Sequence, residues 1–208
     1  MLLLYVFLYS IHGICGITVI GTRFIMNSDM KHLNIKVTND NESDYLVKSV
    51  LDDEDFIISP PLFLLPKNNS SIITVILKEK KEYHSDKTFN LTLTSIPRSS
   101  VNNEYNTVSL AVRHHFKIIY RHAELQSSSF KKIKLRNQND RCIIDNDSNF
   151  SFTVSVSRDR YDTRAKIINL SPHEKKQVMI ENINTKCDAW VSFYDEYNDV
   201  IDSIKLTA

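Results

Sequence analysis

The chain has 208 residues, and its 26 Lys and Arg against 25 Asp and Glu give a formal net charge of +1, so no nucleic-acid partner is expected. Its 42% hydrophobic and 25% charged residues are typical of a folded globular protein and not of a disordered one. Only three glycines are present and none follows Gly21, which excludes phosphate loops, dinucleotide-binding fingerprints and nucleophile elbows from residues 22–208.

The chain begins with an apolar segment. Residues 1–9 are apolar, and the first charged side chain is Arg23. A membrane-spanning helix needs about 20 apolar residues, so this run fits the hydrophobic region of a signal peptide better. We expect residues 1–15 to be a signal peptide that is cleaved near Cys15 or Gly16, so that the remaining chain is exported and does not span a membrane.

Short runs rich in Ile, Val, Thr, Phe and Tyr follow from Gly16 onward, with polar residues alternating and breaks between them. This pattern is typical of an all-β protein, and no stretch has a sustained helical period. Strands are expected at residues 17–26, 32–38, 45–51, 72–77, 89–96, 107–121, 142–144, 150–156, 166–168, 177–180 and 189–194. Turns without glycine need Asn or Asp, which tolerate left-handed backbone, and we expect them at Asn39-Asp40-Asn41, Asn68-Asn69 and Asn102-Asn103.

A break after residue 121 predicts two domains. Residues 122–129 lose the alternation before a new series of strands begins. The chain therefore divides into a β-sandwich at residues 16–122 and a smaller one at residues 127–208, both of ordinary domain size.

Two cysteines, Cys142 and Cys187, remain once the first segment is removed. An even number of cysteines in an exported protein predicts that they pair in a disulfide. The alternative is two separately buried small side chains, since free cysteine is often buried. Trp190 follows Cys187, so the Cys–Trp–Cys order of immunoglobulin domains is missing.

Three segments share their form and order with one known family. Residues 56–63 are FIISPPLF, residues 116–123 are FKIIYRHA, and residues 144–150 are IDNDSNF. They resemble the [ST]-Pro-Pro-Leu-Phe segment, the IKLYYRPA strand end and the Asn-Pro-Thr-Pro turn of the PapD-like periplasmic chaperones of pilus assembly. His122 replaces one proline of this pattern, and both prolines of the turn are lost. The resemblance implies an all-β fold with two immunoglobulin-like sandwiches set at an angle.

The apolar row at Val108, Leu110 and Val112 lies in the longest expected strand, residues 107–121, which is about fifteen residues against the usual five or six. From the residues alone, such alternation favours a strand that faces the core. The resemblance implies instead a donor strand, which the chaperone adds to a pilus subunit that lacks one of its own.

The resemblance also assigns roles to charged residues. It implies that Arg23 and Lys117 bind the C-terminal carboxylate of the subunit, since a guanidinium can grip a carboxylate with two hydrogen bonds and an ammonium adds a point charge. It further implies an interdomain salt bridge among Asp86, Arg121 and Asp195. Surface ion pairs contribute about 0–1 kcal/mol, so this one would orient the domains more than stabilise them.

The implied function is a non-enzymatic periplasmic chaperone that binds fimbrial or pilus subunits by donor-strand complementation and delivers them to an outer-membrane usher. Without a subunit it could cap itself as an oligomer. Neither a cofactor nor a metal is expected, because the scattered histidines, His32, His84, His122 and His173, lack the spacing of zinc ligands.

Two other functions compete with this interpretation. A secreted fibre subunit or adhesin of immunoglobulin-like domains would carry its own donor extension after the signal peptide, whereas residues 17–26 run directly into a strand that contains Arg23. A small exported hydrolase would need a nucleophile and a base, and no Ser/His/Asp group lies on a supporting turn.

Overall fold

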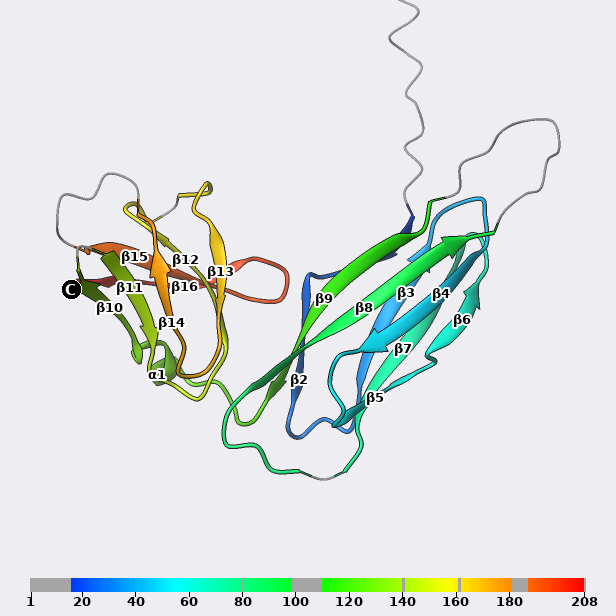
Figure 1. Cartoon of the computed structure of the whole chain (residues 1–208), viewed down its shortest axis with the longest axis horizontal. Coiled ribbons are helices and arrows are strands. Elements are labelled where there is room, and N and C mark those ends of the chain that lie inside the picture. Colours follow the sequence, from blue (N-terminus) through cyan, green and yellow to red (C-terminus); the bar gives the residue numbers. More distant parts are fainter. Residues whose placement is uncertain are drawn as a thin grey trace, which may run out of the picture.

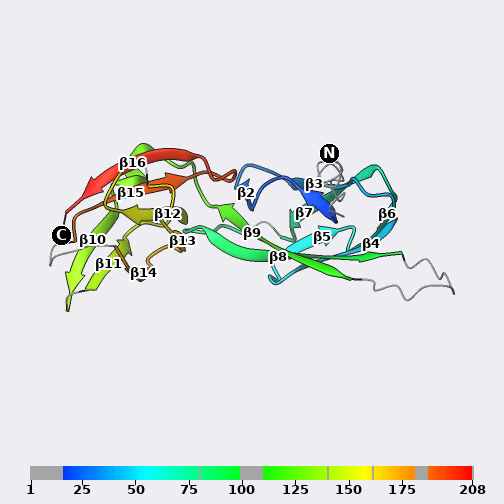
Figure 2. The ribbon, with the colours of Figure 1, turned by 90° about the horizontal axis from the view of Figure 1, so that it is seen from above.

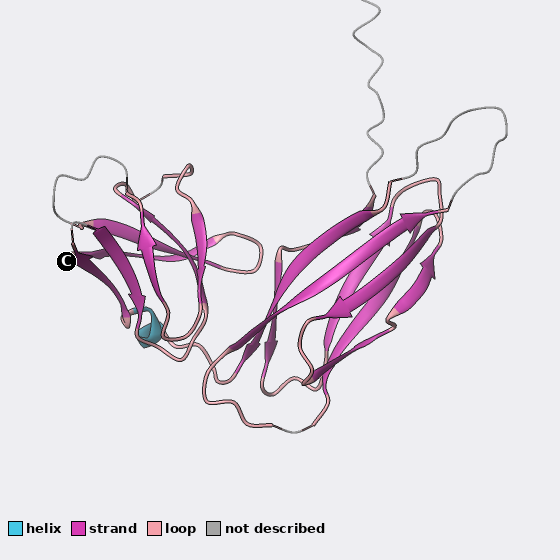
Figure 3. Ribbon diagram, in the orientation of Figure 1, coloured by secondary structure: helices cyan, strands magenta, loops and turns pink. Residues whose placement is uncertain are grey.

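The computed structural model describes residues 16–79, 81–98, 110–139, 141–160, 162–180 and 187–207. These residues form strands and one short helix, arranged as two units set at an angle (Figures 1 and 3). The predicted signal peptide, residues 1–15, lies outside the described residues. No helix among the residues described is long and apolar enough to cross a membrane.

The first unit is a sandwich of two sheets. One sheet has the order β1-β3-β7-β5 and the other the order β2-β9-β8-β4-β6. The strands are β1 (Ile17–Val19), β2 (Arg23–Asn27), β3 (Leu33–Asn39), β4 (Tyr45–Leu51), β5 (Phe56–Ser59), β6 (Leu62–Leu65), β7 (Asn69–Leu77), β8 (Lys87–Pro97) and β9 (Val112–Arg121).

The second unit is a smaller sandwich. Its sheets have the orders β10-β11-β14 and β13-β12-β15-β16. The elements are α1 (Ser127–Phe130), β10 (Ile133–Gln138), β11 (Arg141–Asn146), β12 (Phe152–Ser157), β13 (Ile167–Leu170), β14 (Lys175–Val178), β15 (Ala189–Tyr194) and β16 (Val200–Leu206).

Each unit has its own hydrophobic core, because every second residue of a strand points to the same face of its sheet. In β3, Leu33, Ile35 and Val37 are buried while the residues between them face outward. Phe56 stacks on Phe89 in this core, with ring centroids 4.3 Å apart. The second core is built around residues of β12 and β15, and Leu125, in the predicted break at residues 122–129, packs against it.

The expected strands at 45–51 and 189–194 coincide with β4 and β15. The expected strand at 17–26 is wrong, since it is two strands in different sheets: β1 pairs with β3, and β2 pairs with β9. Gly21 lies between them with φ +105°, a backbone conformation that L-residues rarely adopt. The chain changes sheets at this glycine.

The glycine-free turns use asparagine and histidine. Left-handed φ angles occur at Asn68, Asn139, His173 and Asn198 among the non-glycine residues described. Asn68 is one of the expected positions. Asn39, another, lies at the end of β3, where its side-chain amide donates hydrogen bonds to three carbonyl oxygens. The expected turn at Asn102-Asn103 lies outside the described residues.

A disulfide joins Cys142 to Cys187. Cys142 lies on β11 in one sheet of the second unit, and Cys187 lies just before β15 in the other sheet. The bond therefore connects the two layers of this sandwich.

Candidate functional site

Strand β9 has a free edge. It pairs with β8 from Val112 to Tyr120 on one side, but with β2 only from Lys117 to Arg121 on the other. Among the described residues, no strand covers the segment from Val112 to Phe116 on that second side. The unpaired N–H and C=O groups of such an edge can pair with a strand of another protein.

The apolar row of β9 continues past the end of the core. Phe116 and Ile118 are buried in the first core, but Val112 is 40% exposed and Leu110, on the same row, is 72% exposed. Val108 lies outside the described residues. Of the three residues predicted to form a donor strand, the structure therefore describes Leu110 and Val112.

The expected strand start at residue 107 differs from the start of β9 at Val112. Residues 107–109 are not among those described, and Leu110 and Ala111 lie outside the strand. Val112 is paired with Ser95, and β8 ends two residues after Ser95, at Pro97. The residues that precede Val112 therefore have little of β8 left to pair with. Proline has no N–H to continue the ladder.

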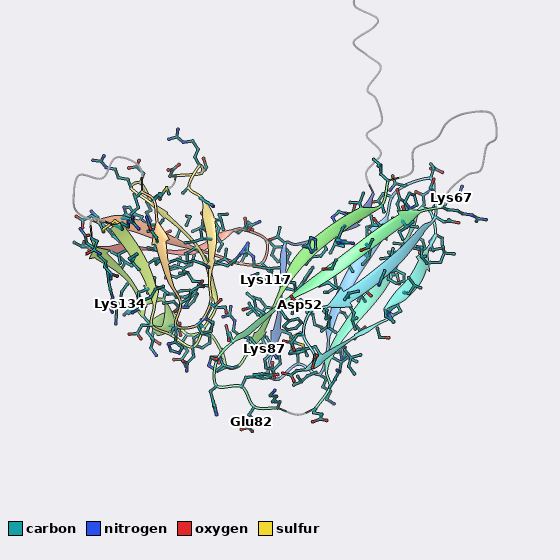
Figure 4. The ribbon with its side chains drawn as sticks, in the orientation of Figure 1. Asp52, Lys67, Glu82, Lys87, Lys117 and Lys134 are labelled. Atoms are coloured by element: carbon teal, nitrogen blue, oxygen red, sulfur yellow. A yellow bond between two sulfur atoms is a disulfide. The ribbon has the colours of Figure 1, made fainter. Side chains whose placement is uncertain are left out.

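Arg23 and Lys117 are direct neighbours. The parallel pairing of β2 with β9 sets them side by side, and neighbouring strands lie about 4.8 Å apart. The adjacent residues Phe24 and Phe116 pack against the first core, so both cations lie on the opposite face of the sheet. Figure 4 shows Lys117 next to β2, where the two units meet.

The Arg23 guanidinium is buried, with 7% of the residue exposed. Its Nη2 donates hydrogen bonds to the Oδ1 of Asn198 and, at 3.4 Å, to the Oγ1 of Thr22. Its Nη1 is buried with no hydrogen-bond partner among the described residues. Burial lowers the pKa of Arg23, and the carboxylates of Asp195 and Glu196 act against this shift.

Lys117 is half-buried, and no described residue forms a hydrogen bond or an ion pair with its ammonium group. Two neighbouring cations therefore share one face, and one of them has a buried N–H group that lacks an acceptor. A carboxylate between them would supply acceptors to both. The predicted carboxylate-binding pair is thus adjacent, and its chemistry suits an anion.

A second buried arginine, Arg121, lies on the same face and is paired with a carboxylate. Its Nη1 donates to the Oδ2 of Asp86 at 2.6 Å and to the main-chain oxygen of Ser151 at 3.1 Å. The Asp86 carboxylate also accepts the N–H of Ser151 at 2.8 Å and the N–H of His122 at 3.1 Å. Asp86 and Arg121 belong to the first unit and Ser151 to the second, so this network connects the two.

Asp195 was expected in the same salt bridge, and the structure corrects this. Within the chain as described, it forms no ion pair with Arg121. Its Oδ1 instead accepts the N–H groups of Tyr197 and Asp199 in the turn between β15 and β16. The turn satisfies this carboxylate locally, and its charge acts on Arg23.

His122 also belongs to the Asp86 network, which the sequence did not predict. Its main-chain N–H and its Nδ1, at 2.9 Å, both contact the Oδ1 of Asp86. A proline, which the family pattern has here, could not provide the N–H group. In the sequence, only the replacement of the family's proline by His122 indicated that this position differs.

Comparison with known proteins adds the family. A family model described as "Pili and flagellar-assembly chaperone, PapD N-terminal domain" matches residues 16–126. The chain is 25% identical over 202 residues to "Chaperone protein MrkB" of Klebsiella pneumoniae, covering 88% of this chain and 86% of that protein. It is 29% identical over 123 residues to "Chaperone protein LpfB" of Salmonella typhimurium, a match that covers 55% of this chain and about half, 53%, of LpfB.

Two solved structures have a similar fold. The structure of the Salmonella enterica SafA pilin in complex with the SafB chaperone gives a TM-score of 0.74 at 14% identity, over 93% of this chain and 96% of the matched chain. The periplasmic chaperone SfaE gives a TM-score of 0.71 at 18% identity over 93% of this chain and 100% of SfaE. Both matches span the two units, and the predicted fold of two immunoglobulin-like sandwiches is confirmed.

Proposed function

The chain belongs to the PapD-like family of pilus- and flagellar-assembly chaperones, and from this premise we propose that it holds a pilus subunit on the free edge of β9 by donor-strand complementation. The family is periplasmic and non-enzymatic. The alternatives of a structural fibre subunit and of a hydrolase are therefore set aside.

The free edge of β9, with its apolar row continuing past the core, is the observation that carries the proposal. Main-chain hydrogen bonds along residues 112–116 would supply affinity, and Leu110 and Val112, with Val108 beyond them, would fill the groove of the incomplete subunit. Burial of each such side chain contributes roughly 1.5–3 kcal/mol before the costs of association.

Arg23 and Lys117 would bind the C-terminal carboxylate of the subunit and so fix the register of the added strand. Val112 lies roughly 17 Å along β9 from Lys117, at about 3.3 Å a residue. A slip of one residue would turn every guest side chain to the wrong face. Because its carboxylate ends at Lys117, the guest strand would run in the same direction as β9.

An exposed apolar group lies on the outer face of the same sheet, and we assign usher binding to it. Leu46 is paired with Leu64 on one side and with Ile96 on the other, and all three are at least 40% exposed. Contiguous exposed apolar residues of this kind typically mark a contact with another protein. This face lies on β4, β6 and β8, so it would stay accessible while β9 holds a subunit.

Self-capping would use the edge of β9 as well. Two copies could cover each other's free edges in the absence of a subunit, and the resulting oligomer would then dissociate when a subunit binds.

Co-expression in a periplasm tests the proposal. Candidate fibre subunits would be co-expressed with the wild type, Arg23→Ala, Lys117→Ala and the control Lys36→Ala, an exposed lysine on β3. We expect the wild type and the control to retain a subunit and the two site variants to lose it. Retention by all four, or by none, would contradict the proposed site.

A further inference from the structure

The turn between β15 and β16 lies against Arg23 and has a defined shape. Figure 2 shows this turn reaching β2 from the second unit. The Asp195 Oδ1 accepts the N–H groups of Tyr197 at 2.9 Å and Asp199 at 2.8 Å, and the Asp195 N–H donates to the Asp199 oxygen at 3.0 Å. Asn198 has a left-handed φ of 70° within it. The turn therefore presents the Asn198 side chain in a fixed position.

Asn198 occupies part of the proposed carboxylate site. Its Oδ1 accepts a hydrogen bond from the Nη2 of Arg23, and its Nδ2 lies 3.5 Å from the Oγ1 of Thr22. A carboxylate that binds the end of a guanidinium with two parallel hydrogen bonds uses both terminal nitrogens. Here one terminal nitrogen faces an amide oxygen, and the other, Nη1, has no hydrogen-bond partner among the residues that the structure describes.

The turn also carries negative charge near the site. Asp195, Glu196 and Asp199 are three of its residues, and the first two interact electrostatically with Arg23. A small cavity of about 80 Å³ between the units is lined by Arg23 together with Asp195 and Glu196. An approaching carboxylate would meet these charges as well as the amide.

We propose that Asn198 is a latch on Arg23, which occupies the guanidinium in the empty chaperone and is displaced by the C-terminal carboxylate of the subunit. This inference rests on the proposed role of Arg23 and Lys117. Asn198 itself is exposed, so it can leave without disturbing a core.

The latch would make the site selective for true chain ends. A carboxylate carries a negative charge opposite the guanidinium and can accept two parallel hydrogen bonds from it, whereas the amide of Asn198 is neutral and offers one oxygen. A carboxylate therefore displaces the amide, whereas a C-terminal amide or an internal main-chain carbonyl gains little over Asn198. Competition with Asn198 lowers the affinity for ligands without a carboxylate more than it lowers the affinity for a chain end. Specificity is commonly achieved by such an element that disfavours the wrong ligand.

Two substitutions test the latch without straining the turn. Glycine and aspartate both tolerate the left-handed backbone of residue 198. Asn198→Gly removes the amide, and Asn198→Asp places a carboxylate on Arg23. Asn139→Gly is the matched control, because Asn139 is a left-handed turn residue between β10 and β11 with φ 53°.

The probe is a short synthetic peptide of alternating valine and threonine with a free C-terminal carboxylate, compared with the same peptide as a C-terminal amide. Dissociation constants would be measured by calorimetry on the full chain. We expect Asn198→Gly to bind the acid peptide about threefold to tenfold more tightly than the wild type, since one competing hydrogen bond is removed, with a smaller change for the amide peptide. Asn198→Asp should weaken acid binding by at least about threefold, and Asn139→Gly should match the wild type.

The outcomes separate the latch from the site itself. If the wild type prefers the acid peptide, Arg23→Ala loses that preference and Asn198→Gly binds no more tightly, the carboxylate site stands and the latch is refuted. Weaker acid binding by Asn198→Gly would make Asn198 a ligand of the carboxylate, which also refutes it. If the wild type shows no preference for the acid peptide, both the site and the latch are wrong.

Discussion

Two buried arginines on one face of the same sheet have opposite environments. Arg121 donates to the buried carboxylate of Asp86, which also accepts N–H groups from both units. Arg23 is equally buried, but it faces a neutral amide, and its Nη1 has no hydrogen-bond partner in the described part of the chain. A buried cation that the protein satisfies internally serves structure, whereas one left incomplete is suited to an external anion. Four substitutions test this difference.

The largest effect is expected at Asp86. Asp86→Asn removes the charge that balances Arg121 and places an amide among N–H donors. Breaking a buried ion pair by removing one partner costs about 3–5 kcal/mol, so the free energy of unfolding should fall by that amount. Urea denaturation measures it, with Asp29→Asn, an exposed acid before β3, as the control. A loss below about 1 kcal/mol would place Asp86 among ordinary surface residues.

The next largest effect concerns binding at Arg23. Arg23→Ala should weaken the binding of a subunit by about 2–4 kcal/mol, or at least about thirtyfold, because the carboxylate loses its bidentate partner. Stability should change by less than about 1 kcal/mol, since the side chain is incompletely satisfied in the empty protein. Calorimetric titration with a subunit and urea denaturation together test this split. A large loss of stability would remove the contrast with Arg121.

His122→Pro sharpens the other side of the comparison. It restores the residue of the family pattern but removes the N–H group and the ring nitrogen that contact Asp86. We expect a loss of about 1–3 kcal/mol in the free energy of unfolding, because the buried carboxylate loses two donors. His122→Ala keeps the N–H group, so it should cost less. Equal losses for the two variants would show that the N–H group is unimportant.

A smaller effect is expected at a half-buried ion cluster around Asp55, which serves as a reference for the two buried arginines. Hydrogen bonds from Lys87 (Figure 4), Tyr83 and Lys81 hold the pKa of Asp55 well below its usual range. A carboxyl with a depressed pKa stabilises the fold above its unfolded pKa, about 3.9, and this contribution is lost as the pH falls below that value. Asp55→Asn should therefore unfold at a lower urea concentration than the wild type at pH 7, and the difference should shrink toward pH 2.

Much of the fold could be predicted from the alternation of apolar and polar residues, because every second residue of a strand with one buried face is apolar. Tyr45, Val47 and Ser49 face inward while their neighbours face outward, and β4 was predicted to the residue. β16 was missed because all of its residues are exposed or half-buried. β10 was missed because only Ile133 and Leu135 are buried in it.

The candidate site was predictable only in part. Arg23 and Lys117 were identified through the family motif, and their adjacency required the parallel pairing of β2 with β9. The contact between Arg23 and Asn198 joins residues 175 positions apart. It depends on how the two units meet, and no local pattern in the chain encodes that.

The sheet change at Gly21 decides how much of β9 is offered to a partner. β2 runs parallel to β9 and would cover residues 112–116 if it extended backward past Arg23, but the left-handed turn at Gly21 sends the chain into the other sheet. A guest strand that runs with β9 and ends at Lys117 would then stop where β2 begins. Guest and host would together form one interrupted strand, with the carboxylate at the break and a single glycine setting the position of the junction.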